Sequence, residues 1–285
     1  MGRPWRVTLG VERFPALTPT LPPATHTNSY ALGEQEVLLV EPATPFDDER
    51  REWLAWARSL SSHGRHPIGI VLTHHHADHV GGASFFANEL RLPLLAHHET
   101  AARLAGEVRV DRFLEDGERI VLAGPRPMPL RVLHTPGHAP GHVCLLDEDT
   151  GAVIVGDMVA SEGTILIEPV DGDMIEYLAQ LDRLAGLSAS VALPAHGEPI
   201  DEPTTLFRRY ITHRLAREAK VVAAFEGMPP EGGSLDALLP VAYADTPPFL
   251  WPIARMSLEA HLVKLVREGR VSRTASGDYR LAPGS

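Results

Sequence analysis

Two spacings of hydrophobic and polar positions alternate along the first 200 residues. Short apolar runs of β type, as in WRVTLGV (5–11), EVLLVEP (36–42) and GIVLTHHH (69–76), predict strands. Apolar residues at helical spacing in FDDERREWLAWARSL (46–60) and MIEYLAQLDRLAGL (174–187) predict helices. Further strands are predicted over 28–32, 118–124, 130–138, 142–147, 151–157 and 189–197, and a further helix over 81–90. This mixture predicts an α/β architecture of two sheets with helices outside them.

The pattern changes after residue 200. TTLFRRYITHRLAREAKVVAAFEG (204–227) predicts one long helix that is basic on part of its surface. The segments that follow predict a Pro/Gly-rich hinge, two helices and a two-stranded wing, over 226–234, 234–245, 257–269 and 270–283. We therefore expect a larger domain over 1–204, and a helical linker with a winged-helix-like domain over 205–285.

Composition narrows the class of protein. A chain of 285 residues with 44% hydrophobic content can bury a sizeable core. Its apolar runs are too short for a membrane-spanning helix, and its N-terminus lacks the apolar stretch and cleavage site of a signal peptide. The single cysteine, Cys144, excludes an intramolecular disulfide and a cysteine zinc cluster, and its strand-like context indicates a buried structural thiol. These features favour a cytoplasmic location.

Charge is unevenly spread along the chain. The net charge of −11 divides into −14 over residues 1–204 and +3 over residues 205–285. The acidic larger domain therefore offers no bulk attraction to nucleic acid, whose backbone is itself negative. Bound cations would soften this acidity if some of the carboxylates are metal ligands.

The stretch VLTHHHADHVGG (71–82) crowds histidine and aspartate into six residues. Residues two apart on an extended strand share a face, so His74 and His76 leave the strand end together, and Asp78 and His79 follow from the turn. Three further candidates lie at the ends of predicted strands, where ligands gather in α/β proteins: His138, Asp157 and His196. Imidazole and carboxylate groups without thiolate suit Zn²⁺, with Fe or Mn also possible.

The order His-x-His-x-Asp-His, then a distal His, an Asp and a last His, resembles the metallo-β-lactamase superfamily over roughly residues 5–200. The resemblance implies a four-layer αββα fold and two metal ions. His74, His76 and His138 would hold one ion, Asp78, His79 and His196 the second, and Asp157 would bridge both. Glu41 and Pro42 depart from the Asp-Gly that commonly ends the preceding strand in this family. Glutamate is longer than aspartate. If Glu41 supports a ligand histidine from the side away from the metal, its side chain must therefore fit in a different way.

The other histidines are interpreted as structural. We expect solvated or hydrogen-bonded roles for His26, His63, His66 and His261. We expect ordinary packing for His75, His97, His98, His134 and His142, although His142 is also placed to support the site from behind.

Two metal ions about 3.5–4 Å apart share a water and lower its pKa toward neutrality, so that a bridging hydroxide is available to attack a carbonyl carbon or a phosphorus. Asp78 is placed both to bind metal and to accept or return a proton, which makes it the candidate catalytic residue. The β-lactamases of this superfamily have Cys where Asp157 stands or lack the bridging acid, so the resemblance disfavours a β-lactam substrate.

The C-terminal order of helices and wing resembles the branch called β-lactamase-like protein 2, single-strand-selective ribonucleases with a winged-helix tail, and related polyketide-associated thioesterases. A dinuclear zinc hydrolase of an ester, thioester or lactone fits the acidic domain best. The first alternative is a single-strand RNA phosphodiester endonuclease, supported by this resemblance and by the basic residues Arg208, Arg209, Arg214, Arg217 and Lys220. The second is a winged-helix nucleic-acid-binding module with a vestigial metal site, which would use Lys264, Arg267, Arg270 and Arg273.

We expect a small-molecule acyl substrate rather than RNA, no membrane partner, and a monomer or homodimer in which the tail acts as a lid or dimer contact. Tyr177, His213 and Arg214 are candidates for substrate contacts.

Overall fold

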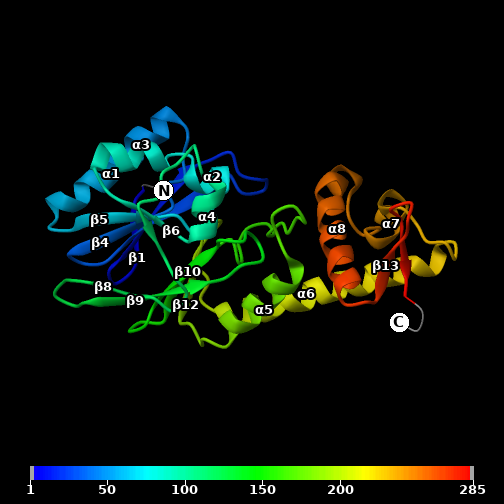
Figure 1. Cartoon of the computed structure of the whole chain (residues 1–285). Helices are drawn as coiled ribbons and strands as arrows, with labels where there is room; N and C mark the ends of the chain where they lie inside the picture. The colour runs from blue at the N-terminus through cyan, green and yellow to red at the C-terminus, as the bar shows by residue number, and fades with distance from the viewer. Residues whose placement is uncertain (1–2, 283–285) are drawn as a thin grey trace.

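The computed structural model describes residues 3–282, and its larger part contains two sheets that face each other (Figure 1). The first sheet has seven strands in the order β1 (Trp5–Thr8), β2 (Val11–Leu17), β3 (His26–Leu32), β4 (Glu36–Val40), β5 (His66–Val71), β6 (Leu94–Ala96) and β7 (Arg112–Phe113). The second has five, in the order β12 (Val191–Pro194), β11 (Ala152–Gly156), β10 (Val143–Asp147), β9 (Met128–His134) and β8 (Arg119–Leu122).

The inner faces of the two sheets form one apolar cluster, which contains Tyr30 and Val71 from the first sheet and Val132 and Leu145 from the second. These residues come from strands with apolar side chains on both faces, as expected of strands that are covered on both sides.

Helices cover the outer face of each sheet. On the first sheet lie α1 (Asp47–Ser62) and α3 (Ala83–Leu90), which bury Trp53 and Phe86 against Ile70. On the second lie α5 (Met174–Ala185) and α6 (Pro203–Ala223), which bury Tyr177 and Phe207. The layers are therefore αββα, which confirms the predicted fold class.

Parallel pairing brings the polar strand ends to one edge. β5 pairs in parallel with β4 and with β6, and β11 pairs in parallel with β12. The carboxyl ends of these strands consequently meet at the same edge of the two sheets. The short helices α2 (Ala77–Val80) and α4 (His98–Arg103) follow β5 and β6 there.

Some elements differ from the sequence prediction. The single strand predicted over 5–11 is a hairpin of β1 and β2, with Gly10 in the left-handed region at φ 74°. The helix predicted over 257–269 is α8, which begins earlier, at Trp251, and runs to Arg267. Pro252 lies in its first turn, where proline costs no helical hydrogen bond.

The C-terminal part contains the end of α6, α7 (Leu235–Ala242), α8 and a hairpin of β13 (Val271–Arg273) and β14 (Tyr279–Leu281), with short 3₁₀ turns at Ala224–Gly227 and Pro248–Leu250. This is the predicted winged-helix order, although Pro283 of the predicted wing lies outside the described residues. The boundary expected between residues 204 and 205 falls in the first turn of α6, so that division stays a prediction. Within residues 3–282, no helix combines the length and apolarity needed to cross a bilayer.

Candidate active site

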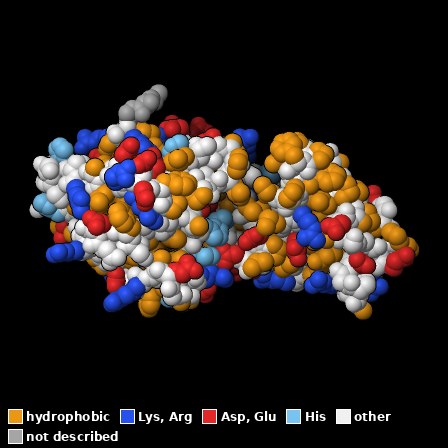
Figure 2. All heavy atoms as spheres, turned by 90° about the horizontal axis from the view of Figure 1, so that it is seen from above, with side chains coloured by type: hydrophobic (Ala, Val, Ile, Leu, Met, Phe, Trp, Pro, Cys, Tyr) orange, Lys and Arg blue, Asp and Glu red, His pale blue; other side chains and the backbone are white. Residues whose placement is uncertain are grey.

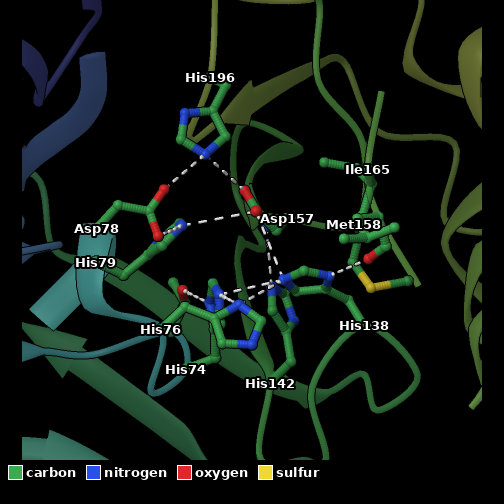
Figure 3. Close-up of polar contacts among 12 residues, drawn as sticks. His74, His76, Asp78, His79, His138, His142, Asp157, Met158, Ile165 and His196 are labelled. Carbon is green, nitrogen blue, oxygen red and sulfur yellow. Dashed lines mark hydrogen bonds and ion pairs between the residues drawn. The ribbon is translucent and has the colours of Figure 1, made fainter. Parts of the chain in front are cut away.

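Three histidines from two strand ends converge on one point (Figure 3). The His74 group, defined as His74, His76 and His138, has His76 Nδ1 3.0 Å from both His74 Nε2 and His138 Nε2, and these two Nε2 atoms are 3.3 Å apart. A tetrahedral zinc ion with bonds of about 2.0–2.1 Å separates its nitrogen ligands by about 3.3 Å. The spacing of the three nitrogens therefore suits a single ion.

A second group lies beside the first. The His79 group, defined as Asp78, His79 and His196, has its carboxylate oxygens 3.8 Å from His79 Nε2 and 3.6 Å from His196 Nε2. Asp157 stands between the groups. Its Oδ2 is 3.5 Å from His138 Nε2 and 3.6 Å from His79 Nε2, and its Oδ1 is 3.4 Å from His196 Nε2. All seven predicted ligands are thus brought together.

Access to this cluster is through two of its members. His74, His79, His138, His196 and Asp157 are buried, whereas the side chains of His76 and Asp78 are 29% and 18% exposed. Histidine side chains are visible where the larger body meets the smaller C-terminal part (Figure 2). A molecule from solvent therefore reaches the cluster beside His76 and Asp78.

Two of the ligand histidines are oriented by their second ring nitrogen. His138 Nδ1 lies 2.9 Å from the carbonyl oxygen of Leu166, and His196 Nδ1 lies 3.0 Å from that of His26. A carbonyl oxygen only accepts, so both Nδ1 atoms carry hydrogen and both Nε2 atoms are left with a lone pair that faces the cluster. This is the usual outer arrangement of metal-binding histidines.

Glu41 supports the cluster from behind. Its Oε1 accepts from His79 Nδ1 at 3.1 Å and from the hydroxyl of Thr73, whose oxygen lies 3.0 Å from His74 Nδ1. Glu41 itself adopts the left-handed region at φ 59°, which is strained for a residue other than glycine. Its carbonyl oxygen is held there by the Ser29 hydroxyl.

Asp171 is a site residue that the sequence interpretation missed. Its Oδ2 accepts from His76 Nε2 at 2.8 Å and from His75 Nε2 at 3.0 Å, while Arg103 pairs with Oδ1 at 3.0 Å. His75, expected to serve packing, therefore shares a carboxylate with a predicted ligand. Asp171 lies in the loop between β11 and α5, and no spacing rule connects an aspartate at that position to the histidines.

His142 holds the backbone of the bridging acid. Its Nε2 accepts the Asp157 backbone N–H at 3.1 Å, and its Nδ1 lies 2.8 Å from the Thr135 hydroxyl. Gly156 makes this approach possible, because a Cβ at that position would lie 2.5 Å from His142 Nε2. His142 thus acts behind the site, as the sequence had allowed, and is not simply packed.

The pKa values of the histidines differ between the His74 group and the His79 group. Burial, together with neighbouring imidazoles, holds the pKa of His74 well below its ordinary value, and burial lowers the pKa of His138 to about 4. Burial also lowers the pKa of His79, but Glu41, Asp78 and Asp157 outweigh it and raise that pKa well above the ordinary value. The carboxylates therefore favour positive charge among the side chains of the His79 group.

The cluster fits a metal centre by its unsatisfied atoms. Among the described residues, His79 Nε2 and Asp157 Oδ1 are buried without a hydrogen-bond partner. Buried polar atoms without partners are costly, and a bound cation would satisfy both of them. The His74 and His79 groups are each compact enough to hold one ion.

Of the three predicted substrate-contact residues, two are buried and one is exposed. Tyr177 is fully buried, and its hydroxyl donates to the carbonyl oxygen of Met158 at 2.7 Å. Arg214 is 5% exposed and donates to the carbonyl oxygen of Ile165. His213 is exposed on α6. Contact of these three residues with substrate stays a prediction.

Comparison with known proteins identifies the family. Residues 22–196 match the metallo-beta-lactamase superfamily and residues 234–280 match the beta-lactamase associated winged helix domain. A beta-lactamase-like protein 2 homolog from Drosophila melanogaster is 30% identical over 286 residues, which cover 96% of this chain and 94% of the relative.

Two further similarities agree with this. The thioesterase pkgB from Emericella nidulans is 31% identical over 216 residues, covering 75% of this chain and 58% of that protein. The crystal structure of a metallo-beta-lactamase family protein from Thermus thermophilus superposes with a TM-score of 0.76 at 26% identity, covering 97% of this chain and 100% of the other. The chain therefore belongs to the metallo-beta-lactamase superfamily of hydrolases and carries the winged helix domain associated with it.

Proposed function

We propose that this protein is a dinuclear zinc hydrolase that cleaves an ester or thioester, lactones included. The observation that carries the proposal is the convergence of seven ligand side chains, with orphaned buried atoms on His79 and Asp157. The His74 group would hold one ion, the His79 group the other, and Asp157 would contact both. When bound, such ions make water available as a nucleophile near neutral pH and polarise the scissile carbonyl.

Asp78 is the proposed catalytic residue. Its carboxylate is the more exposed of the two in the cluster, at 18% against 10% for Asp157. It therefore lies where a substrate enters, and it can accept a proton on a carboxylate oxygen and return it to the leaving group. Replacement by asparagine keeps an oxygen ligand but removes the basic site. We expect Asp78→Asn to lower kcat by about 100-fold or more.

The surroundings of the site favour an acyl substrate over RNA. A pocket of about 540 Å³ beside Asp171 includes carboxylates in its lining: Glu99, Asp116, Asp171, Asp173 and Glu176. Asp116, Asp171 and Asp173 each pair with an arginine, but Glu99 and Glu176 make no ion pair within the described residues, so they leave negative charge that repels a polyanion. Val170, the neighbour of Asp171, is 87% exposed and offers apolar surface. The relative from Emericella nidulans named a thioesterase supports the same substrate class.

The basic residues considered for RNA binding are mostly engaged within the protein. On α6, Arg208 pairs with Asp182, and Lys220 pairs with Asp245 at 2.7 Å. On α8, Lys264 is buried against Glu218 at 2.7 Å. These pairs neutralise the cations that an RNA backbone would need.

The test is a zinc assay together with a hydrolysis panel on the purified protein: aryl ester, acyl thioester, homoserine lactone, nitrocefin, a phosphodiester and single-stranded RNA. We expect two zinc ions per chain and the highest kcat/KM on an acyl compound. An Asp157→Asn variant controls for contaminating esterases. Preference for RNA over every acyl compound would overturn the proposal in favour of the endonuclease.

A further inference from the structure

Residues 164–173, in the segment between β11 and α5, contact the outer ring nitrogens of one metal group. Within residues 164–173, the Leu166 carbonyl oxygen lies 2.9 Å from His138 Nδ1, and Asp171 Oδ2 lies 2.8 Å from His76 Nε2. Both histidines belong to the His74 group. The ring nitrogens behind the His79 group have other partners, Glu41 for His79 and the His26 carbonyl oxygen for His196.

The C-terminal helices hold this segment near both of its ends. Arg214 of α6 donates to the carbonyl oxygen of Ile165, the residue before Leu166. Its guanidinium lies 5.6 Å from the centre of the Tyr177 ring and is buried. At the other end, Arg267 of α8 pairs with Asp173, two residues after Asp171. The two arginines therefore flank the two groups that orient His138 and His76.

Packing connects the same elements. Ile165 and Ile167 are buried in one apolar cluster together with Ala260 of α8. The Asp173 backbone N–H donates to the Gly137 carbonyl oxygen at 2.8 Å, next to His138. The segment is thus fixed between the metal cluster on one side and the C-terminal helices on the other.

We propose that Arg214 and Arg267 are positioning residues through which the C-terminal part sets the geometry of the His74 group. This rests on the proposed metal centre and deepens it, because it gives the C-terminal helices α6 and α8 a role in metal binding rather than in nucleic-acid binding. Outer partners of a ligand histidine typically account for 10–100-fold in metal affinity. The arginines act one contact further out, so their loss weakens the His74 group without affecting the His79 group.

The experiment measures Co²⁺ binding to the full-length protein, by chelator competition and by the visible absorption of the bound ion. A His79→Ala background reports on the His74 group, and a His76→Ala background reports on the His79 group. Into each we introduce Arg214→Gln, Arg214→Lys, Arg267→Ala and the control Arg208→Ala. Arg208 also lies on α6 and pairs with Asp182 of α5, away from the 164–173 segment. The urea midpoint of each variant shows whether it folds.

We expect Arg214→Gln to weaken Co²⁺ binding about 10-fold and to shift its absorption in the His79→Ala background, with no change in the His76→Ala background. Arg214→Lys restores part of the affinity, because an ammonium group also donates to a carbonyl oxygen. Arg267→Ala weakens binding about threefold. This exposed residue keeps the test decisive if Arg214→Gln does not fold.

Two results would overturn the inference. One is equal weakening in both backgrounds or by the Arg208→Ala control, which indicates a general loss of stability. The other is unchanged affinity and absorption in folded Arg214 and Arg267 variants. If the parent protein binds no Co²⁺ at either group, the proposed metal centre fails and this inference fails with it.

Discussion

The catalytic part and the C-terminal part both bury histidine beside carboxylate, but they neutralise the charge differently. In the C-terminal part, Glu218 is 4% exposed and pairs with Lys264 at 2.7 Å and with Arg270 at 2.8 Å, next to the fully buried His261. In the catalytic part, every ion pair that the described residues make with Glu41, Asp78 or Asp157 is to a histidine.

This is the difference expected between a structural polar cluster and a metal-binding one. A buried carboxylate requires positive charge nearby, and lysine or arginine supplies it permanently. Histidine supplies it only when protonated, and its free nitrogen otherwise binds metal. Glu218 therefore already has permanent cations beside it, whereas the carboxylates of the catalytic cluster call for a cation from solution. The following predictions test this distinction.

Removal of metal is expected to have the largest effect. Dialysis against a chelator should lower hydrolysis by about 1,000-fold or more, because the side chains alone cannot ionise water at neutral pH. At an ion concentration about 1,000 times its dissociation constant, binding stabilises the folded protein by about 4 kcal/mol, so the melting temperature should fall as well. The comparison would fail if activity survived chelation. It would also fail if added zinc did not restore the activity that chelation had removed.

Substitutions in the cluster around Glu218 should change the stability of the protein but not its metal content. Lys264→Met removes the buried partner of Glu218 and is expected to lower the free energy of unfolding by about 3 kcal/mol, as for other broken buried pairs. Arg255→Ala is the matched control, since it breaks the exposed pair with Asp236 and should cost less than about 0.5 kcal/mol. Urea unfolding of both variants measures the difference, and equal midpoints would contradict it.

The same cluster predicts a response to acid. Burial raises the pKa of Glu218, but contacts with His261 and Lys264 outweigh it and bring the pKa down to about 2 from an ordinary 4.5. A carboxyl whose folded pKa is depressed adds stability above its unfolded pKa, and this stability is lost as the pH falls. Amide exchange in α6 and α8 should therefore speed up, relative to the exchange of unfolded chain at the same pH, between pH 4.5 and about pH 2. Glu218→Gln should flatten that dependence, and an unchanged profile would count against it.

A smaller effect is expected from replacing Glu41, the acid that supports the catalytic cluster from behind. Glu41→Gln keeps an oxygen that accepts from His79 but removes the charge. We expect it to weaken metal binding at the His79 group about 10-fold, and at the His74 group less, because Thr73 lies between Glu41 and His74. Zinc competition with a chelator measures both affinities. A larger loss at the His74 group would reverse the assigned roles.

The predictability of the two clusters from sequence differed for a physical reason. The seven candidate ligands follow strands, and the alternation of strands with helices fixes where parallel strands end, so local spacing indicated where they would meet. Asp171 lies in an irregular loop with Pro169 and Gly172, where no periodicity indicates direction. Its contact with His76 depends on the tertiary path of that loop.

The C-terminal cluster shows the same limit. The order of helices and wing followed from helical periodicity, and it was confirmed. His261 was expected to be solvated or hydrogen-bonded, but it is fully buried, and neither ring nitrogen has a hydrogen-bond partner among the described residues. Lys264, considered a phosphate contact, is 7% exposed. Which face of α8 is buried depends on its packing against α5 and α6, and polar residues on that face carry no sequence signal of it.

The smallest expected effect concerns RNA. If the cations of the C-terminal part are engaged internally, single-stranded RNA should bind weakly, and the logarithm of the binding constant should hardly change with the logarithm of salt concentration. Each phosphate contact would add about −0.7 to that slope. Arg273→Ala on the wing should alter the binding constant by less than about twofold, and Arg208→Ala should behave alike because Arg208 is paired with Asp182. A steep slope that either variant reduces would mean that these cations face phosphate after all. The charges of the C-terminal part would then be balanced by a bound partner, as in the catalytic cluster, with nucleic acid in place of metal.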